Sequence, residues 1–191
     1  YQNNKWGVID SNGDNVIDPS YAEMIIVPNS KNDVFLCTYD VDYDNNTYKT
    51  KALNSENKEI FTEYDHVEAI SNKDTDNNLW YENDVVRVEK NGLYGLIDLS
   101  GKELLQCEYD KIEALEGVQN TFKITKDGKV GIADNKGNVL ITPSYAEITS
   151  LDKDKSQGFI VKSSDGKYGI VDTANKQVLE TKYDTVEKIY R

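Results

Sequence analysis

Leu93-Tyr94-Gly95-Leu96-Ile97-Asp98 is the stretch that decides the fold, because close variants of it recur along the chain. The variants begin at Lys5-Trp6-Gly7, Lys129-Val130-Gly131 and Lys167-Tyr168-Gly169. A tyrosine follows fifteen residues after the aromatic or valine position each time: Tyr21, Tyr109, Tyr145 and Tyr183. The segment from Lys49 to Tyr64 keeps the same interval in a decayed copy. Self-similarity at a fixed interval predicts a repeat array.

The residues around Tyr94 predict short antiparallel strands. Residues 84–90 contain three valines in a partly alternating pattern, and Asn91-Gly92 is a strong hairpin signal because both turn positions need a positive φ. The return strand is 93–98, Ser100-Gly101 is a second turn, a third strand covers 103–106, and 108–114 is extended again. Within that last segment we expect Tyr109 and Ile112 to be buried together.

The repeated glycine lies inside a strand pattern, where glycine usually marks a β-bulge or a close backbone approach. We expect the neighbouring ring of Trp6, Tyr94 or Tyr168 to lie across an adjacent element, with the glycine leaving room for it. The five register tyrosines and Trp6 are expected in the core. The copy containing Lys49-Thr50 lacks both ring and glycine and should pack most loosely.

About four short strands per unit and about five tandem units predict an all-β protein. We expect one domain, 1–191, with approximate units 1–33, 34–78, 79–118, 119–155 and 156–191. Two architectures fit this pattern: an open twisted repeat array and a closed five-bladed β-propeller. Uneven spacing of the units favours the open array. An open array leaves sheet edges unpaired, so a homo-oligomer formed by edge pairing stays open.

Charge limits the partners. The net charge is −12, from 34 acidic and 22 basic residues, which argues against a nucleic-acid footprint and against docking on an anionic membrane. No apolar run approaches the ~20 residues of a membrane helix.

Residue 1 is Tyr and lies inside a repeat, so we expect the sequence to begin after a processing site or a cut. Cys37 and Cys107 are expected to be buried free thiols, with a single bridge as the alternative.

Polar insertions lengthen the first two intervals, at 28–33, 42–46 and 71–78. Insertions in repeats map to loops, often on the binding face. Tyrosine and tryptophan outside the repeat register are candidates for recognition. The candidate binding residues are Tyr39, Tyr43, Tyr48, Trp80 and Tyr81.

No catalytic, metal or cofactor site is predicted. His66 is the only histidine and occupies a position that varies between copies, which indicates a solvent position. Asp40, Asp42 and Asp44 have the spacing that opens a calcium loop, but Asn45 replaces the required glycine and Lys51 the bidentate glutamate. Incidental calcium binding there, or at 74–78, stays open. No glycine-rich phosphate loop opens a helix, and no carboxylate pair stands out for hydrolysis.

The Trp/Tyr-Gly pair followed by Ile-Asp, and the ending Ile17-Asp18-Pro19-Ser20-Tyr21, resemble the WG (KWG) repeat family over most of the chain. The resemblance implies a β-rich binding or scaffold array of a bacterial protein, extracellular or in the cell envelope, without catalytic residues. We therefore expect a non-enzymatic module that binds a protein or a cell-wall glycan. A structural spacer of a larger surface protein is the second reading, and a glycan-active hydrolase the third.

Overall fold

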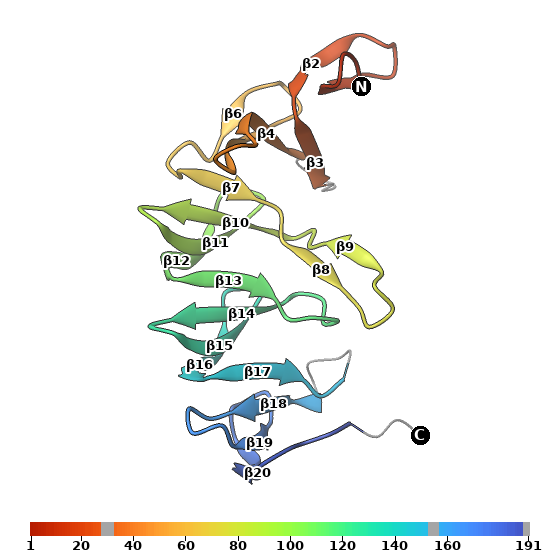
Figure 1. Ribbon diagram of the computed structural model, residues 1–191. Helices are drawn as coiled ribbons and strands as arrows, with labels where there is room; N and C mark the ends of the chain where they lie inside the picture. Colours follow the sequence, from red (N-terminus) through yellow and green to blue (C-terminus); the bar gives the residue numbers. More distant parts are fainter. Residues whose placement is uncertain (28–32, 153–156, 189–191) are drawn as a thin grey trace.

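The structure is a computed structural model that describes residues 1–27, 33–152 and 157–188, and it forms a stack of small antiparallel sheets (Figure 1). We number the sheets 1 to 5 in chain order. Sheet 1 contains two strands, sheets 2 to 5 contain four each, and a hairpin, β8 (Ser71–Lys73) and β9 (Leu79–Tyr81), stands outside them.

The strand bounds of sheets 1 and 2 are β1 (Trp6–Ile9), β2 (Asn15–Tyr21), β3 (Glu23–Val27), β4 (Val34–Asp42), β5 (Thr47–Leu53) and β6 (Glu59–Ile60). Those of sheet 3 are β7 (His66–Glu68), β10 (Val85–Lys90), β11 (Leu93–Asp98) and β12 (Glu103–Tyr109). Those of sheets 4 and 5 are β13 (Lys111–Ala114), β14 (Thr121–Lys126), β15 (Lys129–Asp134), β16 (Val139–Tyr145), β17 (Glu147–Ser150), β18 (Phe159–Lys162), β19 (Tyr168–Val171) and β20 (Gln177–Tyr183).

The open array is confirmed. Figure 1 shows the sheets following one another along a column, with the chain ends at opposite ends of it, so the stack does not close into a propeller. Each complete sheet begins with the strand that follows a register tyrosine, as β13 follows Tyr109. The hydrogen-bonded sheets are therefore offset from the sequence units, and sheet 2 spans residues 23–60.

Turn chemistry agrees with the sequence. Asn91 and Gly92 have φ values of 54° and 77°, as the predicted hairpin requires. At the second turn the Asp98 carboxylate accepts hydrogen bonds from the backbone N–H groups of Ser100 and Lys102, both at 2.9 Å. The same two-bond cap recurs at Asp10, Asn54, Asp134 and Asp172. The repeated aspartate is thus a turn cap.

The repeated glycine faces a bulge in the partner strand, which confirms that part of the prediction. Tyr94 is paired with Tyr109 and Leu96 with Leu105, so the register shifts between them. A Cβ built on Gly95 would lie 2.6 Å from the Leu105 carbonyl oxygen and 2.9 Å from the Cys107 nitrogen. No side chain fits there. The expectation that the glycine makes room for a neighbouring ring is wrong, because the atoms nearest a Cβ at Gly95 belong to Leu105 and Cys107 of the partner strand.

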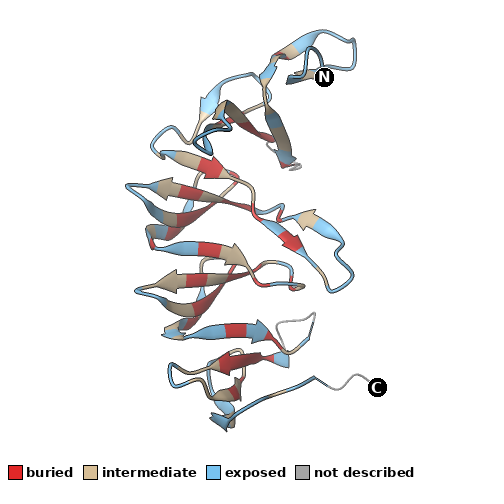
Figure 2. Ribbon diagram, viewed as in Figure 1, coloured by how far each residue is buried: buried red, intermediate tan, exposed pale blue. Residues whose placement is uncertain are grey.

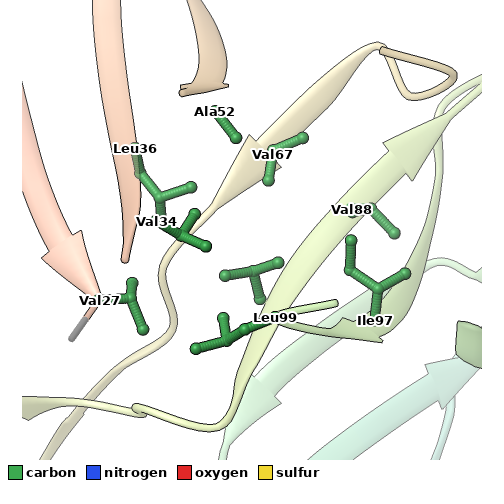
Figure 3. Close-up of a cluster of buried hydrophobic side chains, with 9 residues drawn as sticks. Val27, Val34, Leu36, Ala52, Val67, Val88, Ile97 and Leu99 are labelled. Carbon is green, nitrogen blue, oxygen red and sulfur yellow. The ribbon is translucent and has the colours of Figure 1, made fainter. Parts of the chain in front are cut away.

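Hydrophobic cores lie between consecutive sheets, and we name each contact by its two sheets, for example junction 2/3. Figure 2 shows buried residues running across the strands of the stack. Figure 3 shows the core of junction 2/3, in which Val34, Leu36 and Ala52 of sheet 2 lie opposite Val67 and Ile97 of sheet 3. Strand alternation sends Phe35 and Cys37 into the core of junction 1/2 instead.

Two burial expectations need correction. Tyr109 and Ile112 are buried together as expected, but Trp6 is 46% exposed and Tyr183 is 39% exposed. Both lie in sheets at the ends of the stack, so fewer neighbouring strands cover them. The decayed copy keeps a buried core, with Ala52 at 0% exposure, while its fourth strand shrinks to Glu59–Ile60.

Candidate functional site

A groove of about 460 Å³ lies at junction 2/3, on the face of sheet 2 that meets β7. We call it the junction groove. Its apolar lining comprises Ile25, Leu36, Val41, Val67 and Ala69, and Tyr43 and Tyr48 lie at its rim. Two carboxylates, Glu23 and Glu68, also line it, together with Thr38 and Thr50. Its size lies within the roughly 300–1,000 Å³ of ligand pockets.

The junction groove is lined by a pair of residues that departs from the repeat. In sheet 2, Ile25 of β3 is the cross-strand partner of Leu36 of β4. The equivalent pair is Glu68 and Arg87 in sheet 3, and Glu113 and Lys123 in sheet 4. Both of those pairs form ion pairs. Only sheet 2, among these three, presents two aliphatic side chains at this place.

Arg87 fills the corresponding place at junction 3/4. Its Nη1 donates a hydrogen bond of 2.9 Å to the carbonyl oxygen of Ile112 in β13, and its Nη2 forms an ion pair with Glu68. The guanidinium also lies 5.1 Å from the centre of the Tyr94 ring. An arginine that bridges two sheets in this way occupies the volume that stays open at junction 2/3.

One wall of the junction groove is held by a hydrogen-bonded chain. The Tyr48 hydroxyl donates to Glu68 Oε1 at 2.9 Å, and the other oxygen of Glu68 receives Arg87. Burial alone would raise the pKa of Glu68, but Arg87 and Tyr48 outweigh it and the pKa is lowered. The hydrogen bond to Glu68 in turn raises the pKa of Tyr48. Glu68 is therefore a fixed anion.

A second hollow, of about 620 Å³, lies at junction 4/5. Lys123 takes the place that Leu36 has at junction 2/3, and its lining mixes cations with carboxylates such as Glu116 and Glu147. Lys123 lies 3.9 Å from Glu113. This hollow therefore carries lysines as well as carboxylates, whereas no lysine or arginine lines the junction groove.

The five predicted binding residues do not form one surface. Tyr43 is 87% and Tyr48 45% exposed, and both lie at the junction groove. Tyr39 lies elsewhere: its ring meets Tyr21 edge-on at 6.4 Å, and the Lys51 ammonium lies 4.8 Å from its centre. Alternation along β4 sends Tyr39 towards sheet 1, which sequence spacing alone did not show.

Trp80 and Tyr81 lie in the β8–β9 hairpin, away from the groove. The insertion 71–78 was expected to form a loop, but Asn72 pairs with Trp80 and Ser71 with Tyr81 in a ribbon. Of the other insertions, 28–32 lies outside the described residues, and 42–46 forms the connection between β4 and β5.

A buried polar network fastens the hairpin to sheet 4. Asn72 Nδ2 donates to the carbonyl oxygens of Leu115 at 3.3 Å and Val118 at 3.1 Å, and to Glu82 Oε1 at 3.2 Å. Glu82 is fully buried, and its other oxygen accepts from the Asn120 N–H at 3.0 Å. These partners explain why a polar pair is buried next to the hairpin. We therefore assign Asn72 and Glu82 a structural role.

The cysteines, the histidine and the aspartates considered in the sequence each pack or hydrogen-bond within the fold. Cys37 and Cys107 are free thiols; Cys37 is buried, which raises its pKa to about 12, whereas Cys107 is only half-buried. His66 is half-buried rather than solvent-exposed, with Nδ1 3.3 Å from Thr50 Oγ1. Asp42 and Asp74 accept backbone hydrogen bonds within their own turns. Within 1–27, 33–152 and 157–188, no group of three or more His, Cys, Asp and Glu side chains is placed to hold a metal ion.

Ile25 and Leu36 were not among the binding residues predicted from the sequence. The signal was available, because these two positions are aliphatic where the equivalent positions of two other copies carry opposite charges. Recognising this signal required the strand register. Ile25 and Leu36 correspond to Glu68 and Arg87 only once the β3–β4 pair is aligned with the β7–β10 pair.

Among the comparisons with known proteins, the family model supports the repeat in two regions of the chain. No helix in the described part of the chain is long and apolar enough to cross a membrane. No curated protein matches the sequence. The crystal structure of HIRA(644-1017) is similar at 12% identity with a TM-score of 0.34; the match covers 82% of this chain and 52%, about half, of that one. The family model for the WG containing repeat matches residues 6–28 and 94–129. In these two regions the match agrees with the resemblance that the recurring Trp/Tyr-Gly pair indicated.

Proposed function

We propose that this chain is a non-enzymatic binding module and that its partner, a protein, docks in the junction groove. The observation that carries the proposal is the aliphatic pair Ile25 and Leu36, which stands where sheets 3 and 4 have ion pairs. In a repeat array the scaffold positions recur, so a position that departs from the repeat and lines a groove is where a specific function is expected.

The groove has features of a recognition site. Five of its lining residues are aliphatic, two are threonines and two are glutamates, and two exposed tyrosines stand at its rim. Tyrosine supplies contact area at low entropic cost, which suits binding surfaces. Arg87 and Tyr48 hold Glu68 in place, so one wall of the site is organised before a partner arrives.

Catalysis is not part of the proposal. Glu68 is the carboxylate held most firmly at the groove, and both of its oxygens have partners. A general acid or base needs a pKa near the working pH, and the pKa of Glu68 moves away from it. We place the module outside the cell or in the cell envelope of a bacterium, by analogy with the repeat family. A spacer without a ligand of its own is the second reading.

The test uses a variant in which the aliphatic pair of the groove is replaced by the charged pair found at junction 3/4. In Ile25→Glu/Leu36→Arg the cross-strand pair becomes the Glu and Arg seen in sheet 3. We would immobilise the full chain and offer it surface-protein extract and cell-wall fractions. A defined protein retained by wild type and lost by the double variant supports the proposal.

The matched control is Tyr81→Ala, which removes an exposed ring from the β8–β9 hairpin and leaves the groove intact. Circular dichroism and urea unfolding of both variants establish that they are folded. A partner retained equally by wild type and the double variant places binding elsewhere. Retention of a glycan alone contradicts the assignment of a protein, and no retention at any salt concentration favours the spacer.

A further inference from the structure

We infer that the junction groove recognises a bulky apolar side chain carried by a basic segment of the partner protein. This inference rests on the proposed function, and it names the chemistry of the ligand that the groove accepts.

The floor of the groove selects for an apolar anchor. Leu36 is 5% exposed and Val67 3%, and the half-buried Ile25 and Ala69 pack against the same core. Burying aliphatic surface against these side chains is favourable at about 25 cal/mol per Å². A hydroxyl-rich sugar placed on this floor would lose its hydrogen bonds to water without replacement there, which is costly. The floor therefore favours an aliphatic or aromatic side chain over a glycan.

The charge of the groove selects for a cation next to that anchor. Its lining contains two carboxylates, Glu23 and Glu68, and no lysine or arginine. Glu68 is already paired with Arg87 and Tyr48. Glu23 is exposed and forms no ion pair with the residues that the structure describes. Glu23 is thus the group at the groove to which an incoming ammonium or guanidinium would bind.

The rest of the protein strengthens this preference. The net charge of −12 attracts a basic segment from a distance and repels an acidic one. A second copy of this chain, which carries the same net negative charge, is a poor occupant for the same reason. Junction 4/5 provides an internal contrast, because its hollow presents Lys123 and Lys188 as well as carboxylates. The four carboxylates of the same lining offset these lysines, so charge alone does not direct a basic segment to junction 2/3, and the apolar floor of the junction groove makes the distinction.

The experiment uses three capped hexapeptides as probes. The first is Gly-Lys-Leu-Phe-Lys-Gly, the second replaces both lysines by glutamate, and the third keeps the lysines but replaces Leu-Phe by Ser-Ser. Each is titrated into the ¹⁵N-labelled full chain, and the amide signals of Thr38, Thr50 and Ala69, which line the groove, are followed by NMR. A chito-oligosaccharide is the fourth probe.

We expect the first peptide to shift these three signals and to bind at least tenfold more tightly than either of the other two. Glu23→Lys should weaken its binding about tenfold. The matched control Glu103→Lys changes an exposed glutamate of β12 that does not line the groove, and should have little effect. Raising the salt concentration should weaken binding of the two lysine-containing peptides and should not weaken binding of the glutamate peptide.

Three results would overturn the inference. They are equal binding of the lysine and glutamate peptides, an unchanged affinity in Glu23→Lys, and groove signals that respond to the oligosaccharide but not to the first peptide. The first two leave the proposed function standing if the extract partner is still lost in Ile25→Glu/Leu36→Arg. Retention of that partner by the double variant would instead remove the groove as the binding site.

Discussion

Junctions 2/3 and 3/4 are built from equivalent strands but differ at one pair of side chains. At junction 3/4, Arg87 bridges Glu68 and the carbonyl oxygen of Ile112, and closes the space between the sheets. At junction 2/3, Leu36 and Ile25 occupy the same two positions and a groove of about 460 Å³ remains. The recurring residues thus build the same sheet at both junctions. The residues that face the next sheet determine whether the surface at the junction is charged or aliphatic.

The largest effect is expected in sheet 3, on which both junctions depend. Gly95→Ala would place a Cβ 2.6 Å from the Leu105 carbonyl oxygen, so the bulged strand must move. We expect a loss of about 3 kcal/mol in the free energy of unfolding, measured with urea.

Gly92→Ala, in the turn of the same hairpin, is the matched control. Nothing lies within 4 Å of a Cβ there, and only the positive φ of 77° is unfavourable. We expect a loss of about 1–2 kcal/mol. If Gly95→Ala cost no more than Gly92→Ala, the close approach of the two strands would not be the reason for the glycine.

The next largest effect tests whether Arg87 closes junction 3/4. Arg87→Leu leaves Glu68 without its ion-pair partner and Ile112 without its donor. The side chains of Arg87 and Glu68 are only 25% and 20% exposed, so we expect a loss of about 2 kcal/mol in urea unfolding.

Lys123→Leu changes the equivalent residue of sheet 4, whose ion pair with Glu113 is long, at 3.9 Å, and more exposed. A loss below about 0.5 kcal/mol is expected. Equal losses in the two variants would show that the bridge to Ile112 adds nothing.

A third prediction concerns the acid stability of the wall shared by both junctions. The pKa of Glu68 is lower in the folded protein than its ordinary value of 4.5. Its contribution to stability is therefore fully present above about pH 4.5 and disappears as the pH falls through the lowered folded pKa. We expect Glu68→Gln to be less stable than wild type at pH 7, with the difference shrinking towards pH 3.

The measurement is urea unfolding at a series of pH values, with Glu103→Gln as control, because Glu103 is exposed and forms no ion pair among the described residues. The control should follow the wild-type curve. A constant difference between Glu68→Gln and wild type across the whole pH range would contradict the assignment of Glu68 as a fixed anion.

The smallest effect is expected at the rim of the junction groove. Tyr48→Phe removes the hydrogen bond to Glu68. Because Tyr48 is 45% exposed, the change should cost only about 0.5 kcal/mol in the free energy of unfolding. Tyr43→Phe is the control. Tyr43 is 87% exposed, and within the part of the chain that the structure describes its hydroxyl forms no hydrogen bond. A loss in Tyr43→Phe as large as in Tyr48→Phe would mean that Tyr48 does not order the wall.

The sequence by itself determined the repeat, the strands and their turns. The Tyr94-Gly95 pair, the Asn91-Gly92 turn and the buried pair of Tyr109 and Ile112 were all read correctly, because each depends on neighbours close in the chain. The family match at residues 6–28 and 94–129 agrees with that reading.

Only the tertiary structure decided where the site lies. Tyr43 and Tyr48 meet Ile25 and Val67 because β3, β4, β5 and β7 come together at junction 2/3, whereas Tyr39 turns to the opposite face. Trp6 is exposed because it lies in a two-stranded sheet at the end of the stack. Side-chain direction alternates with each residue of a strand, so a shift of one position reverses the face. Local patterns determine the strands, but the groove depends on the register between them and on which sheet lies next.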